Sequence, residues 1–395
     1  MKRRDFIRNS ALASSLFFVP NFVKAFESID AKSLGYRRLV IIQLSGGNDG
    51  LNTIIPYSND LYYNARPKLA ISDNVIKLND NLALHSSLQP LQNLFDNGEL
   101  SIINNVGYPN PVRSHFRSMD IWQSASSSNE YLQSGWIGRY LDKHGKHSHN
   151  AIELDESLSL ALKGNSFNGL ATNDYKMLHR SARDPYFKNV LNHYQDEHLS
   201  EHNLGYLYKT MIDAKSSAKY IYEKTTTKLS QEDYPQNTFS KQLKNTARFI
   251  NSGLDTKVFY NALGGFDTHA NQKSTQQRLL KIYAEGLASF VKDLKRNGTY
   301  EDTLILTFSE FGRRVKQNSA NGTDHGSANN VFVIGKNLKN AGVYNDLSSL
   351  SDLDENGDLK FTIDFRQIYA TILENWLNTS TKGIITSPQK VLNFI

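Results

Sequence analysis

The chain of 395 residues contains no cysteine. This absence excludes disulfides, thiolate metal sites and a cysteine nucleophile, so an exported form would depend on its core alone for stability. Hydrophobic residues make up 39% of the chain and aromatic residues 11%, which is not the composition of a disordered protein. Internal repeats and low-complexity tracts are also absent. The length allows one or two domains of an ordinary globular protein.

The chain also lacks a strong charge of one sign once its first 25 residues are set aside. The formal net charge is +6, and residues 1–25 contribute +4 of it. The remainder therefore carries only +2, which argues against a nucleic-acid partner. The charged side chains of this leader are Lys2, Arg3, Arg4, Asp5, Arg8 and Lys24.

The leader itself, MKRRDFIRNSALASSLFFVPNFVKAF, resembles a twin-arginine export signal. The pair Arg3-Arg4 precedes a short apolar stretch at 11–19, and Val23-Lys24-Ala25 fits a small-residue cleavage site. An ordinary secretion signal and an uncleaved anchor are the alternatives. We expect export to the periplasm by the twin-arginine route. No later stretch reaches the length of a membrane span, so we expect no integral membrane segment after signal removal.

Buried-strand runs alternate with helical patterns along the rest of the chain, which predicts an α/β fold. Such alternation is typical of a doubly wound, mostly parallel sheet with helices on both faces. We expect one domain over 26–395, with a helical insertion at roughly 186–253. The predicted strands are 37–44, 100–106, 257–263, 303–308 and 331–334, with shorter ones at 151–154 and 159–162. The predicted helices are 86–97, 114–124, 275–295 and 364–377.

Acidic and imidazole side chains gather after these strands, where open α/β sheets place their sites. They are Asp49, Asp267, His269, Glu310, Asp324 and His325. Carboxylate and imidazole together suit zinc, manganese or iron, and carboxylates also suit calcium. Three of these residues have ordinary alternatives: Asp49 lies in an N-D-G turn sequence, Asp267 is placed to cap the next helix, and His269 would then be a surface residue.

A second group of residues is suited to handling an anionic ester. Ser114 begins a predicted helix, where free backbone N–H groups favour an anion, and it is a candidate nucleophile. Arg113 and Arg313 are candidates for holding the anion through paired hydrogen bonds. A simple helix cap for Ser114 and surface salt bridges for the arginines are the alternatives. His85 is either a site residue or a polar residue at a helix start.

Several motifs together resemble the exported "domain of unknown function 1501" family. They are LSGGNDGLNTIIPY (44–57), LALHSSLQPLQNLF (82–95), NVGYPNPVRSHFRSMDIWQSA (105–125), GGFDTHANQ (264–272), SEFGRR (309–314) and GTDHGSANNVFVIG (322–335). That family is grouped by similarity with the alkaline phosphatase and sulfatase superfamily. The resemblance implies an alkaline-phosphatase-like fold with a metal site at the carboxyl ends of the strands.

The resemblance also implies a role for individual residues. Asp49 corresponds to the superfamily's first metal aspartate, and His325 to the late histidine ligand of the same metal. Asp267 and His269 are similar to the Asp/His pair of one metal. Glu310 lies where an aspartate of the second metal is expected.

These features predict an exported metal-dependent hydrolase of a small anionic ester, of the phosphate or sulfate type. Ser114, at the position expected for the superfamily's nucleophile, or a metal-bound water would attack. The chain has no cysteine and no C/S-x-P-x-R sequence around Ser114, which disfavours a formylglycine sulfatase. The alternative is a non-catalytic exported partner protein with a degenerate metal site. Glu310-Phe311 favours it, because the superfamily usually has Asp-His there.

Overall fold

The computed structural model describes residues 36–185, 189, 203–226, 230–387 and 389–395. Arg38–Ile395 form one compact unit. The leader at 1–25 lies outside the described residues, and so does part of the predicted insertion at 186–253. Within the described part, no helix is both long and apolar enough to cross a bilayer.

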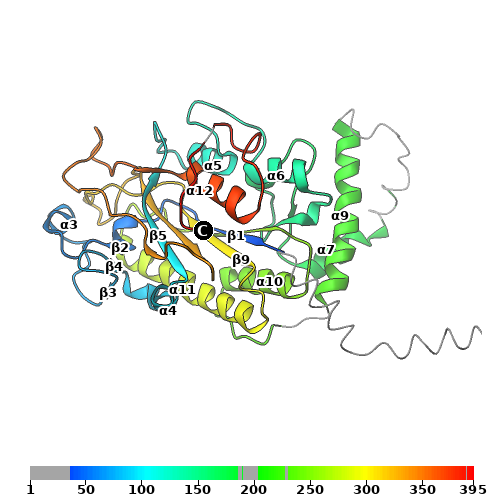
Figure 1. The fold of residues 1–395 in the computed structure, drawn as a ribbon, viewed down its shortest axis with the longest axis horizontal. Helices are drawn as coiled ribbons and strands as arrows, with labels where there is room; N and C mark the ends of the chain where they lie inside the picture. Colours follow the sequence, from blue (N-terminus) through cyan, green and yellow to red (C-terminus); the bar gives the residue numbers. More distant parts are fainter. Residues whose placement is uncertain (1–35, 186–188, 190–202, 227–229, 388) are drawn as a thin grey trace, which may run out of the picture. The chain divides into compact units, whose positions relative to one another are not determined.

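A nine-stranded sheet forms the centre of this unit (Figure 1). Its order is β11-β5-β10-β9-β1-β8-β6-β7, and β12 also pairs with β5. Among the described strands of this sheet, only β10 is antiparallel to its neighbours. The mostly parallel sheet expected from the sequence is therefore confirmed. The strands are β1 (Arg38–Leu44), β5 (Leu100–Gly107), β6 (Ala151–Glu153), β7 (Leu170–Ala171), β8 (Val258–Leu263), β9 (Thr303–Phe308), β10 (Asn329–Ile334), β11 (Gly342–Val343) and β12 (Ile363–Asp364).

Strand β1 shows why the sequence gives continuous apolar runs instead of alternation. All seven of its residues are buried. Val40 and Ile42 belong to one core cluster, and Leu39 and Ile41 belong to another. Because successive side chains point to opposite faces, the strand needs apolar residues at every position when both faces are covered.

Helices cover both faces of the sheet (Figure 1). One face packs against η3 (Ser86–Leu91), α4 (Gln92–Asp96), α10 (Thr238–Asn251) and α11 (Gln272–Arg296). The other packs against α5 (His115–Ser124), α6 (Trp136–His144), α12 (Phe365–Thr371) and η6 (Ile372–Trp376). In addition, α7 (Tyr175–Ala182) packs against α9 (Asn203–Thr225). Helix α10 falls within the predicted insertion, yet it packs into the core beside α11.

Two local expectations differ from the structure. The helix predicted at 86–97 divides into η3 and α4, because Pro90 lies inside it and a proline cannot donate a helical hydrogen bond. The short strand predicted at 159–162 is instead a single 3₁₀ turn, η5 (Leu160–Leu162). The remaining small strands, β2 (Ile54–Ile55), β3 (Ile76–Lys77) and β4 (Ala83–Leu84), make a separate three-stranded sheet.

Candidate metal centre

Three neighbouring parallel strands bring their loops to one edge of the sheet. β9, β1 and β8 lie side by side, so their carboxyl ends meet there. Gly46, in the loop after β1, has φ +115°, and a Cβ at this position would lie 2.4 Å from the backbone nitrogen of Asp267. A glycine is needed because both the conformation and the close approach exclude a side chain. The loop after β1 is thereby packed directly against the loop after β8.

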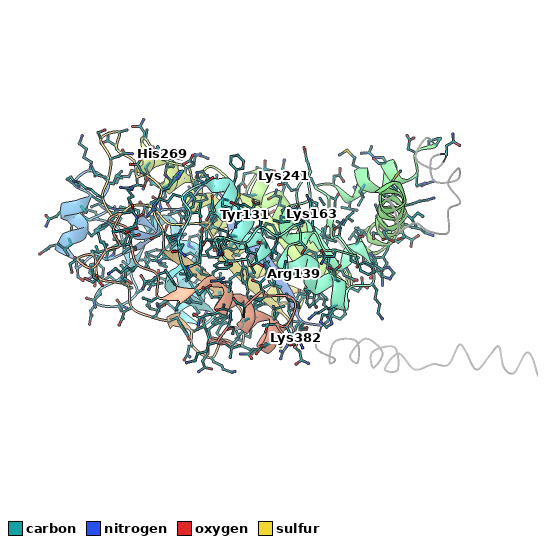
Figure 2. The ribbon with its side chains drawn as sticks, turned by 90° about the horizontal axis from the view of Figure 1, so that it is seen from above. Tyr131, Arg139, Lys163, Lys241, His269 and Lys382 are labelled. Atoms are coloured by element: carbon teal, nitrogen blue, oxygen red, sulfur yellow. The ribbon has the colours of Figure 1, made fainter. Side chains whose placement is uncertain are left out.

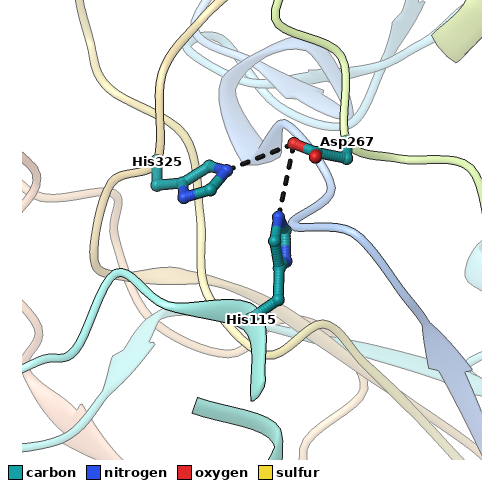
Figure 3. Close-up of side chains that lie close together, drawn as sticks. All are labelled: His115, Asp267 and His325. Carbon is teal, nitrogen blue, oxygen red and sulfur yellow. Dashed lines mark hydrogen bonds and ion pairs between the residues drawn. The ribbon is translucent and has the colours of Figure 1, made fainter. Parts of the chain in front are cut away.

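Three side chains from distant parts of the chain converge at this edge (Figure 3). His115 comes from the first turn of α5, Asp267 follows β8, and His325 precedes β10. Their potential ligand atoms lie within 4.8 Å of one another. A fourth side chain, His269, joins them at the surface, where it is labelled in Figure 2. We call these four residues the Asp267 cluster.

The three imidazoles turn the same nitrogen towards the same oxygen. Nε2 lies 3.3 Å from Asp267 Oδ1 in His115, 3.0 Å in His269 and 3.2 Å in His325. The Nε2 atoms of His269 and His325 are themselves 2.9 Å apart. Nε2 of His115 is buried and makes no well-directed hydrogen bond to any described residue. The three Nε2 atoms therefore converge on Asp267 Oδ1.

The other ring nitrogen of each histidine has its own partner. His115 Nδ1 lies 2.9 Å from Glu310 Oε1, and His269 Nδ1 lies 3.1 Å from Asp324 Oδ1. His325 Nδ1 lies 2.7 Å from the backbone oxygen of Arg113. A carbonyl oxygen only accepts hydrogen bonds, and an ionised carboxylate does likewise. In the tautomer that carries its proton on Nδ1, each imidazole keeps that partner and leaves the Nε2 lone pair free to bind a metal ion.

The arrangement of the ring nitrogens fits a metal ion. With the protons on Nδ1, three Nε2 lone pairs and a carboxylate oxygen face one another, which is repulsive unless a cation lies between them. Two ligands bound at about 2.1 Å and at right angles lie about 3.0 Å apart, close to the separation of the His269 and His325 nitrogens. Outer carboxylate or carbonyl partners on metal-binding histidines are a general pattern. The cluster fits a transition metal ion.

Arg313 holds the loops around the cluster together. Its guanidinium is fully buried and donates to the carbonyl oxygens of Gly46, Gly47, Phe266 and Thr323 as well as to Asp267 Oδ1 at 2.8 Å. Burial by itself raises the pKa of Asp267, but the hydrogen bonds from Arg313 and His325 outweigh burial and hold that pKa well below its usual range. Asp267 is thus ionised, as a metal ligand must be.

The histidines differ in how readily they take up a proton. The hydrogen bond that His115 donates to Glu310 raises the pKa of His115 and outweighs the effect of burial. Burial lowers the pKa of His325 and favours its neutral form. The hydrogen bond from His269 lowers the pKa of Asp324. His325 is therefore better suited than His115 to donate a lone pair at neutral pH.

The position of His325 is reinforced by an acidic turn. Arg113, whose carbonyl accepts from His325, donates its Nε to Asp358 Oδ2 at 2.8 Å, and a second nitrogen contacts Asp358 and Asp354. Asp358 is fully buried, while the Arg113 side chain is 27% exposed. Asp354 builds the turn by accepting from the backbone N–H groups of Asn356 and Asp358. The turn therefore fixes the loop that presents the Arg113 carbonyl.

A comparison with protein families matches residues 36–385 to the family described as "Protein of unknown function (DUF1501)". The chain belongs to the DUF1501 family. The match includes every residue of the Asp267 cluster. A search of the curated proteins gives no match for this DUF1501 chain.

Solved structures of low similarity were also found for this DUF1501 protein. The periplasmic domain of EcEptC from Escherichia coli, in complex with Zn, is 10% identical over 82% of this chain and 77% of that one, with a TM-score of 0.35. The lipoteichoic acid synthase LtaP from Listeria monocytogenes is 11% identical over 78% and 67%, with a TM-score of 0.37. An alkaline phosphatase superfamily protein from Vibrio parahaemolyticus is 11% identical over 80% and 62%, with a TM-score of 0.37.

The structure brings together some of the residues singled out in the sequence. Asp267, His269 and His325 face one another in the cluster, and Glu310 and Asp324 lie behind two of the imidazoles. Glu310 is fully buried and also accepts from the backbone N–H of Gly46 at 2.8 Å. The carboxylates of Glu310 and Asp324 therefore hydrogen-bond to histidines, whereas the sequence predicted that they would bind the metal directly.

Asp49 lies outside the cluster, contrary to its expected place in the ligand set. It is buried and forms an ion pair with the fully buried Arg66 at 2.6 Å, and it also accepts from Gln272. Its other oxygen caps the short η2 turn (Gly50–Asn52) at the N–H of Leu51. The guanidinium already supplies the positive charge that a metal was expected to supply.

The residues expected to handle the anion are placed differently as well. Arg313 is committed to carbonyl groups and Asp267, and Arg113 to the acidic turn, so neither guanidinium is free to hold a substrate as expected. Ser114 is exposed at the start of α5, and its side chain makes no capping hydrogen bond. His85 caps η3 by accepting from Ser87 N at 3.0 Å.

His115 is the cluster residue that sequence reasoning missed. It follows Ser114 directly, within the 105–125 motif. The signal that pointed to Ser114 was the helix start, and the same signal applies to the next residue. A histidine in the first turn of a helix that follows a two-proline loop could have been weighed as a ligand on equal terms.

Proposed function

We propose that this protein is an exported metal-dependent hydrolase of phosphate- or sulfate-type esters, with the Asp267 cluster as its metal centre. The single observation that supports the proposal is the convergence of three Nε2 atoms on Asp267 Oδ1, with each Nδ1 already bonded. A ligand set of three nitrogens and one oxygen suits zinc, iron or manganese better than calcium, which prefers oxygen ligands.

In this proposal the residues of the chain have three tasks. Asp267, His115, His269 and His325 hold the ion, which would polarise the ester and stabilise charge on the attacking or leaving oxygen. Glu310, Asp324 and the Arg113 carbonyl keep the ring protons on Nδ1. Arg313 keeps Asp267 ionised and the three loops in register.

The nucleophile is either Ser114 or water. Ser114 is exposed beside His115 and its side chain makes no capping hydrogen bond, so its hydroxyl can turn towards a substrate. Replacement by alanine separates the two alternatives. We expect Ser114→Ala to abolish turnover if serine attacks, and to leave most of the turnover if water attacks, with metal content unchanged in both cases.

Metal content tests the proposal most directly. We expect the full chain, purified without chelator, to contain about one equivalent of zinc, iron or manganese by elemental mass spectrometry. His325→Ala and Asp267→Ala should lose it. His144→Ala is the matched control, because His144 is an exposed histidine at the end of α6 and should leave the metal in place. Metal-free wild-type protein, or metal retained in both cluster variants, would refute the assignment.

A second candidate is the non-catalytic partner protein. The observation in its favour is that the guanidiniums of Arg113 and Arg313 are both committed to the protein, so neither is left to bind a substrate anion. A panel of phosphate monoesters, phosphate diesters and sulfate esters separates the candidates. Metal-loaded protein that turns over none of them would favour the partner protein.

A further inference from the structure

The two most exposed of the large apolar side chains that the structure describes are both aromatic. Phe116, on α5, is 82% exposed, and Tyr131, in the loop after that helix, is 73% exposed. Tyr131 is labelled in Figure 2. The other exposed side chains of this class in the described part of the chain are not aromatic: Leu61, Met177, Ile212 and Val391.

Arg117 brings Tyr131 against the first turn of α5. Its guanidinium carbon lies 3.8 Å from the centre of the Tyr131 ring. One of its terminal nitrogens also donates to the backbone oxygens of three residues in the loop at 127–130. The loop is thereby tied to the helix at the residue that follows Phe116, so we treat the two exposed rings as one surface, the Phe116–Tyr131 patch. Exposed apolar groups gathered in this way mark binding surfaces.

The patch is continuous with the candidate metal centre. Phe116 follows His115 directly in the first turn of α5, so their Cα atoms are about 3.8 Å apart. The buried side of α5 carries Ser118, Ile121 and Trp122. At about 100° per residue, His115 lies between that side and Phe116. Helical side chains lean towards the N-terminus of their helix, which is the end of α5 that reaches the metal centre.

The patch is suited to an uncharged ring. Arg117 already faces Tyr131 and three carbonyl oxygens, so its charge is engaged by the protein. Asp120 is exposed and lies four residues after Phe116, on the same side of α5. Its carboxylate repels a second negative charge on a ligand. A neutral aromatic group gains both from the burial of apolar surface and from contact between rings.

We propose that the Phe116–Tyr131 patch binds an uncharged aromatic group on the alcohol part of the ester whose phosphate or sulfate group lies at the Asp267 cluster. The alcohol part projects from the reacting group, and Phe116 is the residue next to His115 of the cluster. Phe116 makes the nearer contact and Tyr131 the farther one. The proposal rests on the proposed function and adds a substrate class to it: esters of aryl or arylalkyl alcohols.

Phosphonates test this class without turnover, because their carbon–phosphorus bond is not an ester. Calorimetric titration of the metal-loaded full chain compares benzylphosphonate with methylphosphonate, which share the charged group and differ in the ring. We expect benzylphosphonate to bind about three- to tenfold more tightly, the usual contribution of an aromatic contact. Benzylsulfonate and methanesulfonate form the matching pair for a sulfate-type site. Equal affinities within the pair that binds would overturn the aromatic assignment.

Variants locate the contact. The Phe116→Ala/Tyr131→Ala double variant should bind the benzyl and methyl ligands equally and keep its metal, because neither residue belongs to the Asp267 cluster. Phe116→Trp keeps a ring and should retain the preference for the benzyl ligand. Met177→Ala is the matched control, since Met177 is an exposed apolar residue on α7. A preference that survives in the double variant would place the ring contact elsewhere and overturn the proposal.

A further ligand separates contact between rings from general apolar contact. Cyclohexylmethylphosphonate has nearly the size of benzylphosphonate but no aromatic face, so we expect it to bind more weakly. Equal binding of these two would overturn the aromatic substrate class. Failure of the proposed function gives a different result, which would overturn both: a chain that binds no metal, or a metal-loaded chain that binds none of the phosphonates and sulfonates.

Discussion

Asp49 and Asp267 follow neighbouring parallel strands, yet they have opposite environments. Asp49 is buried and paired with the buried guanidinium of Arg66. Asp267 is 49% exposed and faces three imidazoles, with Arg313 behind it. A buried carboxylate needs a permanent internal cation, because water cannot solvate its charge. Water can solvate the half-exposed carboxylate of Asp267, so this group can give up one partner and bind another. The comparison separates a carboxylate that stabilises the fold from one that is available for binding.

Breaking the Asp49–Arg66 pair should have the largest effect on stability. Arg66→Met leaves the Asp49 charge buried and uncompensated, so we expect a loss of about 3–5 kcal/mol in the free energy of unfolding. Asp267→Asn should lower it by less, because Asp267 is half exposed and four backbone carbonyl oxygens still accept from Arg313. Urea unfolding of both variants at pH 7 checks the contrast. Equal losses in the two would mean that the two carboxylates do not differ as described.

His85 extends the comparison to a buried group without an internal counter-charge. Burial, with a smaller contribution from Lys273, lowers the pKa of His85 to about 4 from 6.5. The unfolded chain thus binds more protons between these values, so the stability is complete above pH 6.5 and is lost as the pH falls towards 4. The gap corresponds to about 3 kcal/mol.

Unfolding curves measured from pH 7.5 to 4 test this expectation. His85→Asn keeps a side-chain acceptor for Ser87 N and should flatten the pH dependence by the same amount. A variant whose stability falls as steeply as that of the wild type would assign the acid sensitivity to other groups.

Asp358 is a buried carboxylate that contacts the metal centre only indirectly, through Arg113 and His325. Asp358→Asn weakens the hold on Arg113 and so on the carbonyl that orients His325. We expect metal affinity to fall about 10- to 100-fold, the usual effect of losing an outer partner. Metal competition with a chromophoric chelator measures it. Asp352→Asn is the matched control, because Asp352 is 73% exposed and contacts Lys360.

Equal metal affinity in Asp358→Asn and wild type would show that the acidic turn has no part in the centre. A merely structural role for Asp358 would lower thermal stability and leave the metal affinity of the folded protein unchanged. Measuring both quantities on the same samples distinguishes these outcomes.

The strands could be predicted from the sequence because each is a continuous apolar run, as in the 303–308 strand, whose bounds the structure reproduces. Once the strand ends were predicted, the acids and histidines that follow them could be found as well. The partner of Asp49 could not, because Arg66 is a tertiary contact with no sequence pattern. Nor could the roles of Glu310 and Asp324, because only the three-dimensional arrangement shows which imidazole nitrogen each one faces.

The single reversed strand, β10, determines how much one connection contributes to the centre. Because β10 runs against β9, it begins at the edge where β9 ends. The connection from β9 to β10 therefore begins and ends at the same edge of the sheet. Glu310 and Arg313 lie in its first part, and Asp324 and His325 lie in its last part. Had β10 been parallel, the return would have started from the far edge of the sheet. Because β10 is antiparallel, both ends of a single loop lie at the metal centre and contribute side chains to it.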